Sequence, residues 1–337
     1  MKIAINGFGR IGRNILRSYI LGNRLKEKSN DIEIIAINDL STPQENAYLL
    51  KYDSVHGKLD NTISHSDKSI IVDGNEICCF SEKDPSRLPW SRLEIDLVFE
   101  CTGLFTSRVD AHQHINAGAK RVLLSAPGKN VDKTIVYGVN HYDLNSNDLI
   151  ISNASCTTNC LAPIAKVIHD NFKIEYGLAN TVHAYTNDQS LLDMHHSDPL
   201  RARAANLSMI PSRTGAASTV GEVLPELKER LDGLAIRVPV ANVSLLDFTF
   251  STEHNFSLSA LDDAIVSSSA NEMNGIISIN SLPLVSSDFG KDPHSAIYDM
   301  SHTKKVGNVT KILAWYDNEW GFSNRMLDVA IYLNQLN

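Results

Sequence analysis

The 337-residue sequence contains no long apolar segment, no concentrated basic charge and no repeated unit. No apolar run approaches the ~20 residues that a membrane-spanning helix needs. The formal net charge is -8 without a cluster of Lys and Arg, which argues against nucleic acid as the main partner, because phosphate backbones require concentrated positive charge. The absence of repeats and biased tracts excludes solenoid and low-complexity proteins. We therefore expect an ordinary globular protein with no membrane segment.

Cysteine is scarce and odd in number, with five residues: Cys78, Cys79, Cys101, Cys156 and Cys160. The N-terminus resembles a strand and carries no signal-peptide core. An odd count in that context favours reduced thiols and a cytoplasmic location. Cys156 and Cys160 are four residues apart, but a metal site needs further ligands at matching spacing, so we expect no metal.

The length predicts two domains, because single cores rarely grow this large. In the first part of the chain, short apolar segments alternate with helical ones, which indicates an α/β fold with a doubly wound, Rossmann-type parallel sheet. The expected strands are Lys2–Asn6, Ile32–Asn38, Leu97–Cys101, Arg121–Ser125 and Ile135–Val139, and the expected helices are Arg13–Leu21 and Val109–Ala117.

The pattern changes near Asn153, where longer strands with antiparallel character begin. This part predicts an α+β catalytic domain with a mostly antiparallel sheet. The C-terminal segment is an amphipathic helix candidate that returns to the first domain, which gives residues 1–153 with 318–337 as one domain and 154–317 as the other. The expected strands are Leu178–Tyr185, Ala235–Ser251 and Val309–Tyr316, and the expected helices are Thr157–Asp170, Thr214–Arg230, Ser257–Ala270 and Ser323–Leu336.

Gly7, Gly9 and Gly12 form a G-x-G-x-x-G pattern directly after a predicted strand and at the start of a predicted helix. The first glycine permits a tight turn, the second lets the backbone approach a pyrophosphate, and the third lets helix and strand pack closely. The helix N-terminus adds amide donors and a positive dipole end. These features predict a dinucleotide site, although the pattern alone could mark a plain tight turn.

Asp39 follows the second predicted strand, where a carboxylate accepts hydrogen bonds from the ribose hydroxyls and repels a 2′-phosphate. It therefore favours NAD over NADP. The alternative interpretation is a turn aspartate at a strand end.

Residues 152–160 read SNASCTTNC, with small polar residues before a helical segment. This puts Cys156 at a helix N-terminus, where dipole and amides favour a thiolate. The hydroxyls of Ser155, Thr157 and Thr158 suit an anion there. The alternative is a pair of buried structural cysteines, which we prefer for Cys160.

A lone thiol needs a base, and His183 lies near the end of a predicted strand in the same domain. The residues themselves do not select it over the eleven other histidines among the twelve in the chain. Its role stays open at this point.

Four further segments make the pattern specific: residues 5–12 (INGFGRIG), 183–189 (HAYTNDQ), 214–217 (TGAA) and 315–321 (WYDNEWG), together with SNASCTTNC. Along nearly the whole chain, the sequence resembles the glyceraldehyde-3-phosphate dehydrogenase family. The resemblance implies that Cys156 attacks the substrate aldehyde and His183 is its base. It further implies oxidation through a thiohemiacetal to an acyl thioester, from which inorganic phosphate takes the acyl group.

The resemblance also implies ligands for two anions, the substrate phosphate and the attacking phosphate. Hydroxyls, a glycine amide and Arg side chains are suitable donors. The matching residues are Ser155, Thr186, Arg201, Thr214, Gly215 and Arg237.

For the cofactor NAD, the resemblance implies that Arg10 and Ile11 belong to the pyrophosphate turn and Asn318 holds the carboxamide. Ser125 is expected on the nicotinamide side. Lys83 stands near the adenine where the family usually has arginine, which keeps the charge but loses planar stacking. A homotetramer is implied, with residues 188–204 packed between subunits.

Two other functions remain as alternatives. Residues 283–297 resemble erythrose-4-phosphate dehydrogenase as much as the glycolytic enzyme, but that sister enzyme typically lacks Thr186 and the TGAA run. A non-enzymatic binding protein could keep the same fold. Retention of both Cys156 and His183 argues against it.

Overall fold

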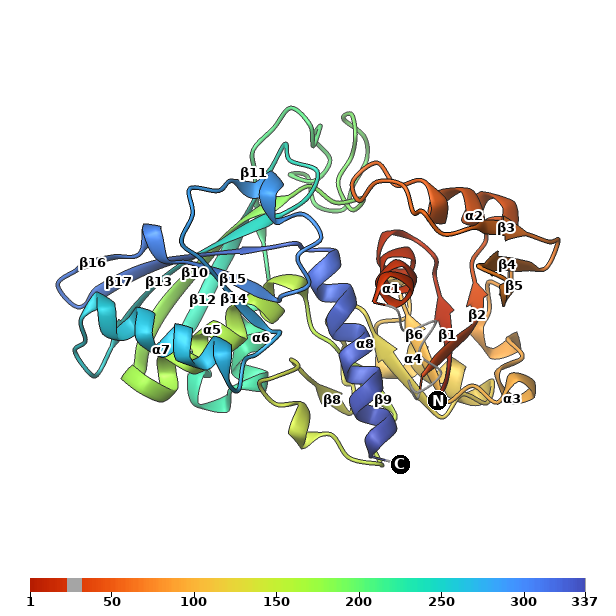
Figure 1. The fold of residues 1–337 in the computed structure, drawn as a ribbon, viewed down its shortest axis with the longest axis horizontal. Helices are drawn as coiled ribbons and strands as arrows, with labels where there is room; N and C mark the ends of the chain where they lie inside the picture. The colour runs from red at the N-terminus through yellow and green to blue at the C-terminus, as the bar shows by residue number, and fades with distance from the viewer. Residues whose placement is uncertain (23–31, 337) are drawn as a thin grey trace. The chain divides into compact units, whose positions relative to one another are not determined.

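The computed structural model describes residues 1–22 and 32–336, and the chain forms two compact units (Figure 1). Unit 1 comprises Met1–Ile135, His141–Ala154 and Ser323–Asn337, and unit 2 comprises Val136–Asn140 and Ser155–Phe322. The C-terminal helix α8 (Trp320–Gln335) crosses this boundary, and most of it belongs to unit 1. There its Asn324 Nδ2 donates to Ser18 Oγ at 3.3 Å.

Unit 1 is built on a nine-stranded sheet in the order β3-β4-β5-β2-β1-β6-β7-β9-β8. Only β3–β4 and β4–β5 pair antiparallel, so the predicted doubly wound parallel sheet is confirmed. Strands β6 and β7 are buried at every residue, as expected for strands covered on both faces. The strands are β1 (Lys2–Asn6), β2 (Glu33–Asn38), β3 (Ile63–His65), β4 (Ser69–Val72), β5 (Asn75–Phe80), β6 (Leu97–Glu100), β7 (Arg121–Leu124), β8 (Lys133–Thr134) and β9 (Ile150–Ser152).

The helices of unit 1 begin near local start signals. At the start of α2, Thr42 precedes Pro43 and forms a reciprocal capping box with Glu45. This arrangement satisfies backbone amides that would otherwise lack a partner. In α4, Ser107 accepts from the Asp110 amide. The helices are α1 (Arg10–Leu21), α2 (Pro43–Lys51), α3 (Trp90–Leu93) and α4 (Arg108–Asn116).

The predicted strand at Ile135–Val139 is wrong. Residues 136–140 form a turn in which the Val136 amide donates to Asn140 Oδ1 at 2.8 Å and Gly138 has a φ of 88°. That left-handed conformation is incompatible with a strand. The sheet position is taken instead by β9 (Ile150–Ser152), which pairs with β7 and was not predicted.

Unit 2 contains a mixed eight-stranded sheet in the order β11-β12-β10-β13-β17-β15-β14, with β16 beside β17. Only β10–β12 and β14–β15 are parallel, so the predicted mostly antiparallel sheet is confirmed. The strands are β10 (Ile174–Ala184), β11 (Ile210–Arg213), β12 (Leu231–Val238), β13 (Ser244–Thr252), β14 (Ile277–Asn280), β15 (Ala296–Asp299), β16 (Lys304–Val306) and β17 (Val309–Tyr316).

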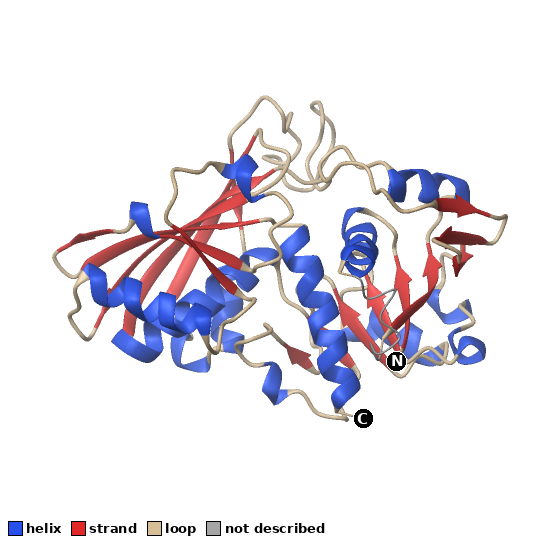
Figure 2. Cartoon of the chain, viewed as in Figure 1, coloured by secondary structure: helices blue, strands red, loops and turns tan. Residues whose placement is uncertain are grey.

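Helices α5 (Cys156–Phe172), α6 (Ala216–Val223) and α7 (Leu258–Ala270) lie along one face of this sheet (Figure 2). Ser257 caps α7 through the Ala260 amide, as its start signal predicted. Within the described part of the chain, no helix combines the length and apolar character that crossing a membrane requires.

Two predicted elements of unit 2 are each divided. Ala235–Ser251 is not one strand but parts of β12 and β13, separated around Pro239 and around Val243, which has a φ of 64°. The predicted helix Thr214–Arg230 ends at Val223, because Pro225 cannot continue it. A short 3₁₀ turn at Pro225–Leu227 follows.

Candidate active site

Cys156 is the first residue of α5 and is presented by a sharp turn. Ala154, two residues before Cys156, is fully buried and has a φ of 55°. This left-handed conformation costs about 1–3 kcal/mol for a residue other than glycine. Ser155 caps the helix by accepting from the Thr158 amide at 3.0 Å. The turn and cap together hold Cys156 at the helix N-terminus, where the sequence predicted it.

His183 reaches Cys156 because it is the penultimate residue of β10. Its Nε2 lies 3.5 Å from Cys156 Sγ, within the distance of a hydrogen bond to sulfur. The imidazole is 4% exposed and contacts the Tyr316 ring edge to face, with centroids 6.1 Å apart. Among the twelve histidines of the chain, the structure therefore identifies His183 as a base candidate for Cys156.

The protonation of His183 is decided by two contacts at Nδ1 that exclude each other. The carbonyl of Ala184 lies 2.6 Å from Nδ1 and can only accept, whereas Nη1 of Arg237 lies 2.8 Å from Nδ1 and can only donate. Only the first contact leaves Nε2 unprotonated and able to take a proton from Cys156. Arg237 also donates to the Ala184 carbonyl at 3.2 Å, so it has a second partner when Nδ1 carries hydrogen.

Burial, together with the nearby Arg237 charge, lowers the pKa of His183 to about 3. Burial also raises the pKa of Cys156, although Arg237 and the Thr157 donors lower it. The helix N-terminus thus acts in the predicted direction, toward a thiolate, while burial of the sulfur acts against it. The thiolate expected at Cys156 stays a prediction.

Arg237 enters the site through strand register. β10 and β12 pair in parallel with His183 opposite Arg237, so two residues 54 positions apart become neighbours. β11 adds Ser212, whose hydroxyl accepts from Arg201 Nη2 at 2.8 Å. Arg201 also pairs with Asp188. Both arginines lower the pKa of His183, which is consistent with cationic surroundings for an anion.

Two hydroxyl residues of the predicted anion sites, Ser155 and Thr214, lie at the N-termini of α5 and α6. The Thr158 hydroxyl donates to the Ala216 carbonyl at 3.4 Å, which joins the starts of these helices. Gly215 caps α6 and Thr214 accepts from the Ala216 amide. Thr186 follows β10 and its amide donates to Gln189.

Thr157, a predicted anion ligand, belongs to a chain of buried hydroxyl groups. Its hydroxyl is buried and bonds to the Tyr316 hydroxyl at 2.8 Å, which in turn bonds to Thr181 at 2.7 Å. It also donates to the Cys156 sulfur and thereby lowers the pKa of Cys156. Sequence reasoning missed Tyr316 and Thr181 as supports of the catalytic pair. The only signal was the presence of Tyr316 within residues 315–321.

Asn318 is held by a buried hydroxyl in unit 2. Ser244 Oγ accepts from the Ala184 amide at 3.1 Å and donates to Asn318 Oδ1 at 3.0 Å. This bond fixes the amide orientation of Asn318 and leaves its Nδ2 to donate elsewhere. Ser244 was not predicted as a site residue, because its position depends on the pairing of β13.

In unit 1, the glycine pattern forms the turn between β1 and α1. Gly7 has a φ of 90°, and a Cβ there would lie 2.7 Å from the Thr102 amide nitrogen. A Cβ on Gly12 would lie 2.2 Å from the Gly7 carbonyl oxygen. A Cβ on Gly9 would meet nothing within 4 Å, so the backbone there is open to a ligand. The turn therefore fits a pyrophosphate.

The other predicted cofactor residues lie at the same carboxyl edge of the parallel sheet. Asp39 follows β2, and its Oδ2 accepts from the Phe8 amide at 2.8 Å. Arg10 begins α1 and pairs with Asp53 at 2.6 Å, while Ile11 follows it in the helix. The remaining two are Lys83, after β5, and Ser125, directly after β7.

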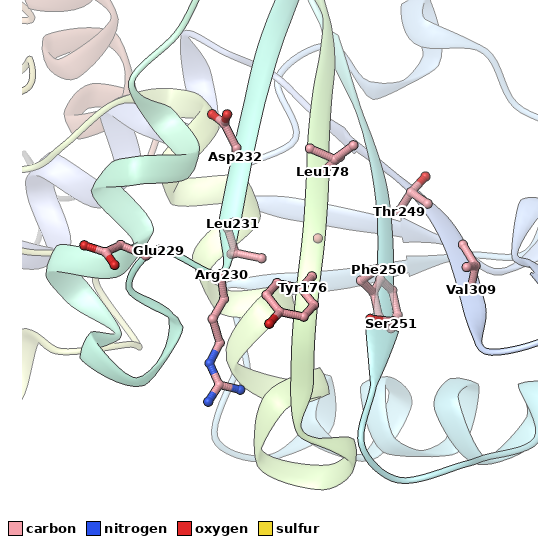
Figure 3. A pocket seen from close by; sticks show the side chains of 11 residues that line it. Tyr176, Leu178, Glu229, Arg230, Leu231, Asp232, Thr249, Phe250, Ser251 and Val309 are labelled. Atoms are coloured by element: carbon pink, nitrogen blue, oxygen red, sulfur yellow. The ribbon is translucent and has the colours of Figure 1, made fainter.

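The hollow shown in Figure 3 lies away from this chemistry. It is lined by Tyr176, Leu178, Arg230, Thr249 and Val309, among others. Neither Cys156 nor His183 borders it. We therefore do not assign it to the reaction.

Two family models match the chain. The model described as glyceraldehyde 3-phosphate dehydrogenase, NAD binding domain, matches residues 1–108. The model described as glyceraldehyde 3-phosphate dehydrogenase, C-terminal domain, matches residues 155–318. The two matches fall on the parts of the sequence that carry the glycine turn and the cysteine–histidine pair.

Curated relatives match from end to end. The chain is 52% identical over 333 residues to a glyceraldehyde-3-phosphate dehydrogenase of Pseudomonas aeruginosa, covering 99% of this chain and 98% of the relative. It is 51% identical over 334 residues to a chromosomal enzyme of that name from Cupriavidus necator, with 99% and 98% covered. A relative of the same name from Cereibacter sphaeroides is 49% identical over 337 residues, with 100% and 99% covered.

Proposed function

This chain belongs to the glyceraldehyde-3-phosphate dehydrogenase family, and we propose that Cys156 and His183 carry out its covalent chemistry. The protein oxidises D-glyceraldehyde 3-phosphate in the presence of inorganic phosphate to 1,3-bisphosphoglycerate, with reduction of NAD, a reaction of glycolysis. One observation carries the residue assignment: the 3.5 Å contact between Cys156 Sγ and His183 Nε2.

The proposed first step is attack of the Cys156 sulfur on the aldehyde carbon. His183 takes the thiol proton at Nε2, and its Nδ1–H donates to the Ala184 carbonyl and holds the ring in place. His183 returns the thiol proton to the oxyanion that the attack forms, which gives the thiohemiacetal hydroxyl. It takes the hydroxyl proton back as the thiohemiacetal gives up hydride and becomes an acyl thioester. When bound, NAD supplies the nicotinamide ring that accepts the hydride. Phosphate then attacks the thioester carbonyl carbon, which forms the acyl phosphate and releases the Cys156 thiolate. The thiolate takes up the proton held by His183.

Arg237 has a proposed role in both anion sites. Its Nη1 lies 2.8 Å from His183 Nδ1, a contact that requires an unprotonated Nδ1 and hence the tautomer that cannot act as a base at Nε2. A bound phosphate group attracts the guanidinium more strongly than a neutral imidazole does. Anion binding would therefore release Nδ1 and favour the tautomer that accepts the Cys156 proton.

The remaining anion ligands are proposed from their positions. Three lie at the N-termini of α5 and α6, Thr186 follows β10, and Arg201 contacts Ser212 of β11. Ser155, Thr186, Arg201, Thr214 and Gly215 provide hydroxyls, amides and a guanidinium, which suit phosphate. Thr157 is better assigned to the sulfur than to an anion, because its hydroxyl already bonds to Tyr316.

For NAD, the proposed contacts are the Gly7–Gly12 turn with Arg10 and Ile11 for the pyrophosphate and Asp39 for the ribose. Lys83 lies toward the adenine and Ser125 toward the nicotinamide, with Asn318 donating to the carboxamide. The open backbone at Gly9 and the fixed Asn318 amide support this assignment. We assign residues 1–153 with 318–337 to NAD binding and 154–317 to catalysis. The compact units differ from these bounds in that residues 136–140 and 318–322 belong to unit 2 and residue 154 to unit 1.

A homotetramer is the proposed assembly. The sheet face of unit 2 opposite its helices exposes Tyr176, Leu178 and Leu234 at 69, 66 and 46%. Large contiguous apolar surface usually marks an interaction site, and homo-oligomers are the commonest assemblies. Residues 191–209 add further exposed apolar side chains. Light scattering on Leu178→Asp should detect smaller particles, whereas Leu104→Asp, at an equally exposed position of unit 1, should leave the mass unchanged.

We also propose a cytoplasmic location, which the five unpaired cysteines support.

The test of the assigned residues is NADH formation measured with and without phosphate, for the wild type and Cys156→Ser. Sustained turnover should require both the thiol and phosphate. Turnover by the serine variant at the wild-type rate would overturn the assignment. Comparing kcat/KM for glyceraldehyde 3-phosphate and erythrose 4-phosphate measures selectivity between the two sugars.

A further inference from the structure

A row of hydrogen-bonded polar groups runs across the carboxyl ends of adjacent strands in unit 1. In the order β5-β2-β1-β6, it contains the backbone amide and carbonyl of Glu82, just beyond β5, then the buried side chains of Asn38, Asn6 and Glu100. Asn6 is the register partner of both Asn38 and Glu100. The three side chains are 5, 1 and 2% exposed for Asn38, Asn6 and Glu100. We name this set the carboxyl-end row.

The direction of every hydrogen bond in the row follows from the backbone of Glu82. Its amide must donate, so Asn38 Oδ1 accepts, at 2.9 Å. Asn38 Nδ2 then donates to the Glu82 carbonyl at 2.9 Å and to Asn6 Oδ1 at 2.7 Å. Asn6 is left with its Nδ2, which donates to Glu100 Oε2 at 2.6 Å. Neither amide can be flipped without breaking the series.

A second series of hydrogen bonds reaches Glu100 from Trp90 of α3 and His114 of α4. The Trp90 indole must donate, and it does so to His114 Nδ1 at 3.1 Å. The hydrogen of this fully buried imidazole therefore sits on Nε2, which lies 3.0 Å from Glu100 Oε2. Asn6 Nδ2 and His114 Nε2 are 3.4 Å apart because two donors share one acceptor oxygen.

The other carboxyl oxygen of Glu100 holds the loop that follows β6. The Thr102 amide donates to Oε1 at 2.8 Å. The Thr102 hydroxyl accepts from the Leu104 amide at 3.0 Å, so its own hydrogen goes to Glu100 Oε1 at 2.5 Å. Glu100 thus accepts from four donors, and none of them belongs to a Lys or Arg side chain.

Three members of the row directly precede a backbone segment of the proposed NAD site, and the fourth, Glu100, precedes the loop after β6. Asn6 precedes Gly7, Asn38 precedes Asp39 and Glu82 precedes Lys83. A Cβ on Gly7 would lie 2.7 Å from the Thr102 nitrogen, so the loop held by Glu100 and the glycine turn are in close contact. A shift in one loop must therefore move its neighbour.

From this geometry we propose that Glu100 is a positioning residue for dinucleotide binding. Both series of hydrogen bonds end at its carboxylate, which can only accept. Glu100 thereby fixes the spacing of the glycine turn, the Asp39 turn and the loop after β6. Glu100 does not touch the ligand in this role. The proposal rests on the assignment of NAD to these loops.

Glu100→Gln is the decisive variant because it keeps the shape and supplies an NH₂ group where only acceptors fit. In either orientation of the glutamine side chain, its NH₂ group would face two hydrogen-bond donors. We expect the dissociation constant for NAD, measured by calorimetry, to rise about tenfold to a hundredfold, the effect of a lost charge-assisted hydrogen bond. The Michaelis constant for NAD should rise similarly, while kcat at saturating NAD stays within about twofold, since the chemical groups lie in unit 2.

Asp96→Asn is the matched control. Asp96 accepts from the Lys2 amide at 2.7 Å and pairs with Lys120 at 2.7 Å, directly before the amino end of β6. Loss of the charge and of one acceptor oxygen should lower the melting temperature but leave NAD affinity unchanged. Alkylation of Cys156 by iodoacetamide without NAD should be the same in all variants.

Thr102→Val keeps the test decisive if Glu100→Gln does not fold. It removes one donor to Glu100 and should weaken NAD binding about threefold to tenfold. Unchanged NAD affinity in a folded Glu100→Gln or Thr102→Val protein would overturn the proposal, as would equal weakening by Asp96→Asn. If instead the wild type fails to bind NAD, the cofactor assignment itself is wrong.

Discussion

The two units hold their functional groups in different ways. Unit 1 uses backbone: a glycine turn, helix amides and loops at the carboxyl ends of parallel strands. Unit 2 uses side chains from separate elements, since Cys156 begins a helix while His183 and Arg237 meet through the register of β10 and β12. A backbone site is sensitive to added volume and loop spacing, whereas a side-chain site is sensitive to the identity of single atoms. Each contrast can be measured.

The largest expected effect is in unit 2. Cys156→Ser should reduce kcat by roughly 10³-fold or more, because removal of a nucleophile eliminates the covalent route. NAD affinity should not change, since the glycine turn is untouched. A parallel loss of NAD binding in calorimetry would break the proposed separation between the two units.

His183→Asn should reduce kcat by about 10²- to 10⁴-fold, the usual contribution of a general base. The asparagine amide can still donate to the Ala184 carbonyl, so the variant should remain folded. Single-turnover NADH formation would measure the loss. A rate within a factor of two of the wild type would contradict the role of His183 as base.

The difference between the two units also explains which features can be predicted from the sequence. The glycine turn and Asp39 were predicted because their chemistry is encoded within short spacings beside one strand. Cys156 was predicted because small polar residues precede its helix. His183 and Arg237 required the family resemblance, since the register of β10 against β12 is a tertiary property. Ser244 and Tyr316 were missed for that reason, and the strand at Ile135–Val139 failed because Gly138 forms a turn.

Gly12→Ala tests the backbone character of unit 1. The added Cβ would lie 2.2 Å from the Gly7 carbonyl oxygen, and overpacking of this kind costs about 1–3 kcal/mol. We expect weaker NAD binding together with a normal rate of Cys156 alkylation. An alanine variant with wild-type NAD affinity would mean that the turn has room the structure does not show.

The smallest expected effect is on acid stability. The pKa of His183 is about 3 in the folded protein and near 6.5 in a model peptide, so between these values the unfolded chain binds the extra proton. Stability is therefore lost as pH falls through this window. Between pH 6.5 and 5, proton uptake by His183 in the unfolded chain lowers the free energy of unfolding by about 2 kcal/mol. This contribution should be absent in His183→Asn. Denaturant unfolding at both pH values would measure the difference, and identical losses in the two proteins would refute it.

Mass spectrometry of the enzyme after incubation with glyceraldehyde 3-phosphate and NAD, but without phosphate, tests the central claim most directly. The account predicts an acyl adduct on the peptide containing Cys156, a burst of about one NADH per site, and release of the adduct when phosphate is added. Sustained NADH formation with no adduct on Cys156 would contradict it.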